Sequence, residues 1–139
     1  MTDNTIILGG NGERQVLLDA AMANRHGLIT GATGTGKTVT LQVLAENFSR
    51  MGVPVFAADI KGDLSGLAGA GSRHPKIDER LEYIGIDSHN FEPCPTVFWD
   101  VFGAKGHPVR TTVSEMGPIL LSNLLELNET QEGIVQIAF

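Results

Sequence analysis

The chain has 139 residues, of which 42% are hydrophobic, and it carries 16 acidic and 10 basic side chains. This length suits one domain with a modest apolar core. The formal net charge of -6 offers no general attraction for nucleic acid or anionic membranes, so contact with either would need a local basic patch or another part of an assembly.

The cysteine content and the lengths of the apolar runs indicate the cellular compartment in which the protein is expected. Cys94 is the only cysteine, which excludes a disulfide within the chain and suits a reducing environment. It lies between two prolines without a thiol or histidine partner at metal-binding spacing, so we interpret it as a structural loop residue. No apolar run approaches the ~20 residues that a membrane helix needs. We therefore expect a cytoplasmic protein with no membrane partner.

Short apolar segments and one long helical pattern organise the first sixty residues. Residues 5–8 predict a short strand, and residues 28–30 predict a buried strand. Over residues 37–51 apolar positions recur at helical spacing, and Gly52 stands where a helix commonly stops. Residues 53–58 predict a second buried strand. Strand, helix and strand in this order make a βαβ unit, which implies parallel strands covered by a helix.

The next segment predicts a loop, a short helix and a strand. Residues 62–75 are rich in glycine and predict a mobile surface loop. Residues 78–83 predict a short helix. Residues 96–102 have the β-branched and aromatic content of a third strand, with Trp99 in the core.

Two helices are expected in the last part of the chain, the first over about residues 114–127 and the second from residue 129 onward. Each is preceded by residues with the spacing of an N-terminal capping box. The two pairs are Thr112 with Glu115, and Asn128 with Gln131.

A glycine-rich segment between the strand at 28–30 and the following helix satisfies the Walker A pattern G-x-x-x-x-G-K-[ST]. Its glycines let backbone N–H groups turn inward around a β-phosphate, and the helix directs its positive end at the same anion. Lys37 is expected to reach the β- and γ-phosphate oxygens, and the Thr38 hydroxyl to ligate Mg²⁺; both are the candidate catalytic residues. The predicted nucleotide contacts are Gly31, Ala32, Thr33, Gly34, Thr35, Gly36, Lys37, Thr38 and Val39, with ATP and Mg²⁺ as cofactors.

Two alternatives to a phosphate site fit the sequence less well. A chance glycine-rich turn with a surface lysine and threonine is disfavoured by the strand before it and the helix after it. A dinucleotide-binding fold is disfavoured because neither GATGTGKT nor GGNGER contains the G-x-G-x-x-G spacing.

Hydrolysis needs a carboxylate near the metal, and two predicted strands end in an acid, at Asp59 and at Asp100. Neither acid is followed by a second one. Asp59 follows the strand directly after the helix, where kinases and GTPases can place their metal-binding acid, and is therefore a candidate Mg²⁺ ligand. We favour a Walker B segment beyond residue 139, because the apolar pattern of residues 133–139 halts without a capping signal and the chain looks cut there.

The sequence HGLITGATGTGKTVTLQVLAENFSRMGVPVFAADIKGDLSG resembles the N-terminal part of HerA/FtsK-type P-loop ATPases. The sequence PTVFWDVFGAKGHPVRTTVSEMGPILLSNLLELNETQEGIVQIAF resembles a bacterial HerA-like family often labelled helicase HerA-like. The resemblance covers nearly the whole chain. It implies an α/β P-loop NTPase fold of the RecA/ASCE-like type, a parallel sheet flanked by helices and truncated before Walker B. Residues 1–139 would then be the N-terminal part of a single ATPase domain.

Site residues follow from the same resemblance. Gly34, Gly36, Lys37 and Thr38 carry over as nucleotide and Mg²⁺ contacts. The turn from Asp59 through Lys61 to Gly62 is similar to a strand-end motif of FtsK-like and conjugation-coupling ATPases, with turn capping as the alternative role for its side chains. Arg110 is a conceivable arginine finger, although a structural ion pair with Glu115 is the favoured interpretation.

The resemblance implies an ATPase that acts in a DNA translocase or helicase-type motor. Members of the superfamily are ring-forming, usually hexameric motors that move DNA or peptide through a central channel, so a homo-oligomer and a DNA partner are expected of the full-length protein. The fragment itself is expected to bind nucleotide with little turnover. Two alternatives stay open: a nucleotide-gated interaction domain that orders residues 62–75, and a small phosphotransferase that uses Asp59 and a lid at residues 73–80.

Overall fold

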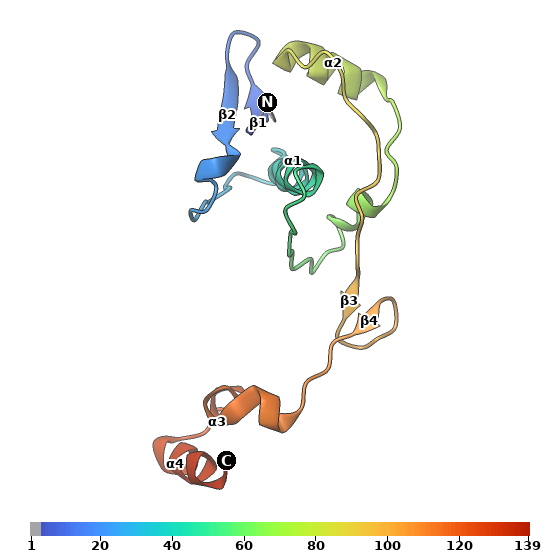
Figure 1. Ribbon diagram of the computed structural model, residues 1–139. Coiled ribbons are helices and arrows are strands. Elements are labelled where there is room, and N and C mark those ends of the chain that lie inside the picture. The colour runs from blue at the N-terminus through green and yellow to red at the C-terminus, as the bar shows by residue number, and fades with distance from the viewer. Residues whose placement is uncertain (1–3) are drawn as a thin grey trace. The chain divides into compact units, whose positions relative to one another are not determined.

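The computed structural model describes residues 4–139 and contains two compact units, with the boundary between Thr96 and Val97 (Figure 1). The first unit holds β1 (Thr5–Gly10), β2 (Gln15–Asp19), the 3-10 helix η1 (Ala20–Met22), α1 (Lys37–Arg50), the 3-10 helix η2 (Ser65–Ala68) and α2 (Pro75–Ile84). The second unit holds β3 (Trp99–Asp100), β4 (His107–Pro108), α3 (Val113–Leu124) and α4 (Glu129–Ala138). Helices and two two-stranded sheets make this an α/β chain.

The first unit contains an antiparallel hairpin of β1 and β2. Its turn is closed by the Asn11 side chain, whose Oδ1 accepts hydrogen bonds from the N–H groups of Glu13 and Arg14 at 3.2 and 2.9 Å. Ile6 on β1 is fully buried, and both α1 and α2 contact that strand. Ile6 is the only buried apolar side chain in the part of the chain that the structure describes, so the core of this unit lies around β1. The strand predicted at residues 5–8 is confirmed.

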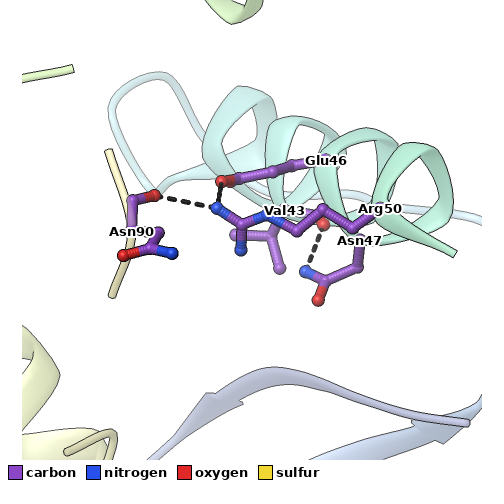
Figure 2. Close-up of polar contacts among 5 residues, drawn as sticks. All are labelled: Val43, Glu46, Asn47, Arg50 and Asn90. Atoms are coloured by element: carbon purple, nitrogen blue, oxygen red, sulfur yellow. Dashed lines mark hydrogen bonds and ion pairs between the residues drawn. The ribbon is translucent and has the colours of Figure 1, made fainter. Parts of the chain in front are cut away.

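The helix predicted over residues 37–51 is confirmed as α1, and its end follows the predicted glycine signal. Gly52 adopts φ 78°, its N–H donates to the Ser49 carbonyl at 3.0 Å, and the Val53 N–H donates to the Phe48 carbonyl at 2.9 Å. This is a Schellman motif, which satisfies the last carbonyls of a helix. Near the same end, Arg50 pairs with Glu46 (Figure 2).

The short helix predicted at residues 78–83 is confirmed and is longer at its start. Pro75 occupies the first turn of α2, where a missing N–H costs nothing, and the His74 Nδ1 accepts from the Lys76 N–H at 3.2 Å. At the other end, Gln15 Nε2 donates to the carbonyls of Ile84 and Gly85, both at 3.0 Å. Those bonds attach α2 to the hairpin.

The two buried strands predicted beside α1 do not form. Residues 28–30 and 53–58 have no strand pairing, and Leu28 and Phe56 expose 88% and 89% of their surface. A strand is stabilised by its ladder partners, and in the described chain β1 pairs with β2 and β3 with β4, while neither segment joins either sheet. The expected βαβ unit and its parallel RecA-like sheet are therefore not formed within residues 4–139.

The third predicted strand shrinks to the two residues of β3, which pair in parallel with β4. Trp99 was expected in the core, and this prediction is wrong, since Trp99 is 65% exposed. A two-residue ladder has no second layer against which an indole could be buried. The centre of the Trp99 ring instead lies 6.3 Å from that of His107 on the neighbouring strand.

Both helices predicted in the last part of the chain are confirmed, as α3 and α4, and they pack against each other. Both predicted capping boxes are present: Thr112 Oγ1 accepts from the Glu115 N–H at 3.2 Å, and Asn128 Oδ1 accepts from the Gln131 N–H at 3.0 Å. Gly117 interrupts α3 with φ 72° and ψ 166°, and the helix resumes at a proline. Among the helices of residues 4–139, none is long and apolar enough to cross a membrane.

Candidate functional site

Residues 31–38, called here the glycine loop, include the first two residues of α1. Gly34 and Gly36 adopt left-handed φ values of 81° and 95°, which glycine reaches without steric cost. Gly36 is the N-cap of α1 and supplies no side-chain hydrogen bond, and the first bond into the helix runs from the Thr40 N–H to the Gly36 carbonyl at 3.0 Å. The N–H groups of residues 37–39 precede that bond, so they are available to an external acceptor.

Three donors converge on one carbonyl inside this loop. The Ala32 oxygen accepts from the Lys37 ammonium at 2.7 Å and from the Thr35 hydroxyl at 2.8 Å. The Thr35 N–H reaches the same oxygen at 3.4 Å. The Lys37 side chain therefore folds back onto the loop that precedes its own helix.

Asp59 caps its own turn. Its Oδ1 accepts from the Gly62 N–H at 2.9 Å, and its Oδ2 accepts from the Leu64 N–H at 2.8 Å. These contacts match the turn-capping role that sequence analysis gave as the alternative to metal binding. Gln42 on α1 donates from Nε2 to the Asp63 carbonyl at 2.9 Å, which holds this turn against the helix that follows the glycine loop. Sequence reasoning missed Gln42, because one glutamine on a helix carries no pattern.

Asp100, the other acid at a predicted strand end, organises the loop between β3 and β4. Its carboxylate accepts from the N–H groups of Lys105, Phe102 and Ala104 at 2.8, 3.0 and 2.7 Å. The hydrogen bonds from Lys105 and then Phe102 are the main reasons why the pKa of Asp100 lies below its ordinary value. The carboxylate belongs to the second unit and is engaged by its own backbone.

The predicted ion pair between Arg110 and Glu115 does not form in the described residues, where the ion pairs are those of Arg50 with Glu46 and of Arg73 with Asp78. Glu115 is instead taken up by its capping box, where it accepts from the Thr112 N–H at 3.1 Å and the Thr112 hydroxyl at 3.0 Å. These two bonds hold the pKa of Glu115 below its ordinary value.

The basic side chains at residues 73–80 also have structural contacts. Arg73 pairs with Asp78 at 3.5 Å, His74 caps α2, and the Arg80 guanidinium lies 5.3 Å from the ring centre of Tyr83. None of these contacts favours the lid that a phosphotransferase would need. In residues 4–139, no three His, Cys, Asp or Glu side chains gather closely enough to hold a metal ion.

The structure is that of a small α/β protein with a glycine loop at the N-terminus of a helix whose first residue is Lys37. The helicase HerA-like C-terminal family model matches residues 4–139, and the chain belongs to that family. The predicted HerA-like kinship is thus confirmed. The expectation that residues 1–139 are an N-terminal portion is corrected, because the matched family model describes a C-terminal domain. The position of a glycine loop near the start of a sequence does not reveal which domain of a longer protein that sequence represents. Comparison with curated proteins and with solved structures gave no match.

Proposed function

We propose that the glycine loop binds Mg-ATP and that the chain serves the ATP-driven motor of a HerA-like helicase. The observation that carries this proposal is local. The N–H groups of the first turn of α1 have no partners inside the helix, Gly36 provides no side-chain cap for them, and the Lys37 ammonium bonds to the loop just before them. Open N–H groups at a helix N-terminus and an adjacent positive charge together favour a phosphate. The family description, which names a helicase, supports the wider assignment.

Each part of the glycine loop has a role in this proposal. The N–H groups of the glycine loop and of Val39 would surround the phosphates. Lys37 would exchange the Ala32 carbonyl for phosphate oxygens, and the Thr38 hydroxyl would hold Mg²⁺. Bound Mg²⁺ would neutralise charge that develops on the phosphates during transfer.

Hydrolysis requires more than the glycine loop supplies. A carboxylate must lie near Mg²⁺, and another group must orient the attacking water. Asp59 is the candidate metal-side acid, yet both of its oxygens accept N–H groups of its own turn. We therefore propose that residues 1–139 bind nucleotide with little turnover, and that other residues of the full-length protein or a neighbouring subunit complete the site.

The DNA partner and the oligomer belong to the full-length assembly in this proposal. The formal net charge of -6 gives the chain no general attraction for DNA. A homo-oligomer, hexameric as in the ring-forming superfamily, would bring further surfaces together around a substrate. A cytoplasmic location accords with a motor of this kind.

Binding of a fluorescent ATP analogue in the presence of Mg²⁺ tests the central claim. We expect saturable binding by the chain, competed by unlabelled ATP, and lost in Lys37→Ala. Lys105→Ala is the matched control, because it removes a lysine side chain from the β3–β4 loop of the other unit. Binding that survives Lys37→Ala, or that Lys105→Ala weakens equally, would overturn the assignment of the glycine loop. DNA-stimulated ATP hydrolysis by the full-length protein would extend the proposal to a nucleic-acid motor.

One contact favours a second candidate, a nucleotide-gated interaction domain. Gln42 joins α1 to the Asp63 carbonyl, so a change at the start of α1 could reach the turn after Asp59. This version predicts that Mg-ATP slows amide exchange in residues 62–75 and that Gln42→Ala abolishes this protection. Gln136→Ala, which removes an exposed glutamine contact on α4, should leave it intact.

A further inference from the structure

The turn at the start of the glycine loop is closed by side chains. The Thr35 N–H lies 3.4 Å from the Ala32 oxygen, beyond the usual range for an N–H···O bond, whereas the Thr35 hydroxyl lies 2.8 Å from it. The Lys37 ammonium is the second short donor, at 2.7 Å. Two side chains therefore determine how the Ala32 peptide is oriented.

These two donors differ in what a phosphate would do to them. A charge-assisted hydrogen bond between an ammonium and an anionic oxygen is stronger than one to a neutral carbonyl. Lys37 is therefore drawn away from Ala32 when a phosphate enters. The Thr35 hydroxyl is carried on a short side chain beside Gly31, and once Lys37 contacts a phosphate it is the one short donor left on that carbonyl.

Gly31 makes room for this hydroxyl. A Cβ atom at position 31 would lie 2.6 Å from the Thr35 Oγ1, closer than real Cβ contacts come. Threonine has a short side chain, so Oγ1 could avoid such an atom only by rotating about χ1, which would break its bond to Ala32. The glycine at the first position of the loop and the threonine at the fifth are thus coupled through space.

We infer that Thr35 is a positioning residue, whose hydroxyl holds the Ala32 peptide in place while Lys37 moves from that carbonyl to a phosphate. This inference rests on the proposed nucleotide binding and adds to it a specific contact within the loop. Thr35 acts through Ala32 and takes no part in the chemistry.

Two substitutions separate the hydroxyl from the rest of the side chain. Thr35→Val keeps the shape and removes the donor, and we expect it to weaken Mg-ATP binding about two- to tenfold, as the loss of one hydrogen bond implies. Thr35→Ser keeps the donor and should restore binding to within about twofold of the original chain. Thr96→Val is the matched control, since it deletes a similar bond, from the Thr96 hydroxyl to the Cys94 carbonyl at 2.9 Å, outside the glycine loop.

The outcomes distinguish this inference from the function on which it rests. If the original chain binds Mg-ATP and Lys37→Ala abolishes binding, while Thr35→Val binds as tightly as the original, the role of Thr35 is refuted and the nucleotide site stands. Equal weakening by Thr35→Ser and Thr35→Val would also refute it, because the hydroxyl would then not be the cause. If the original chain does not bind Mg-ATP, the proposed function fails and this inference fails with it.

Discussion

Replacing Gly36 with alanine tests whether the left-handed entry to α1 shapes the site. Gly36 adopts φ 95° and ψ 14°, and no heavy atom lies within 4 Å of the position that a Cβ would occupy. The cost of Gly36→Ala therefore comes from the backbone alone. A left-handed conformation costs an L-residue about 1–2 kcal/mol. Alanine must either hold that strain or let the peptide turn, which would redirect the N–H groups of the first helical turn.

Residue-resolved amide exchange measures this cost locally. We expect Gly36→Ala to speed exchange of the Thr40 amide, whose N–H bonds to the carbonyl of residue 36, by about 5- to 30-fold. Gly133→Ala is the control: Gly133 lies inside α4 with open space around it and without a positive φ. Alanine there should stabilise the helix by about 0.5–1 kcal/mol and slow exchange in α4. Effects of the same sign at the two positions would refute the reasoning.

Three other substitutions have distinct causes and distinct outcomes. Glu126 adopts φ 52° just after α3, where glycine is favoured, so Glu126→Gly should slow amide exchange of Leu127 by the equivalent of about 1 kcal/mol. Among residues 4–139 the buried Ser122 hydroxyl has no hydrogen-bond partner, so Ser122→Ala should stabilise α3 by about 1–2 kcal/mol in the same measurement, and faster exchange would contradict this. The lowered pKa of Asp100 means that its contribution to the β3–β4 loop is fully present above its ordinary pKa and is lost as pH falls through the folded value. The amides of Phe102, Ala104 and Lys105 should therefore lose protection from exchange below about pH 4, and Asp100→Asn should remove this dependence.

Signals that act within a few residues could be predicted from the sequence. The capping boxes that begin with Thr112 and Asn128, and the glycine that ends α1 at position 52, all form as expected. Each depends on atoms no more than about five residues apart, because helix caps are closed by backbone groups of a single turn. Their geometry needs nothing from the rest of the chain.

Strands and burial could not be predicted in the same way. Residues 28–30 and 53–58 have apolar patterns that suit a buried strand, yet a strand exists only where another strand offers its N–H and C=O groups. Trp99 shows the same limit for burial, since an aromatic side chain enters a core only where a second layer covers it. Partners and layers are set by contacts between distant residues, which a local pattern does not contain.

The roles of the two strand-end aspartates could not be predicted from the sequence. Asp59 and Asp100 each stand after an apolar run, which is how metal-binding acids are presented in P-loop proteins, but both accept N–H groups of the turns that follow them. An aspartate beside a glycine-containing turn forms such bonds readily, because its short side chain reaches the next few amides. A metal-binding aspartate and a turn-capping aspartate look the same in a sequence, and they are distinguished only by whether backbone N–H groups lie within reach of the carboxylate.

The position of the glycine loop depends on α1, which contacts other parts of the first unit at several points along its length. Ile6 is buried on β1, the strand that α1 contacts; Gln42 attaches the middle of α1 to the turn after Asp59; and Arg50 donates to the Asn90 carbonyl at 2.8 Å (Figure 2). Each of the two hydrogen bonds is modest, since an exposed hydrogen bond contributes about 1 kcal/mol to stability. Together they fix the direction of the helix, and hence the direction in which the N–H groups after Gly36 point. Substitution of Arg50 should therefore alter phosphate binding by the glycine loop without changing the loop itself, which ties the proposed chemistry to the packing of the first unit.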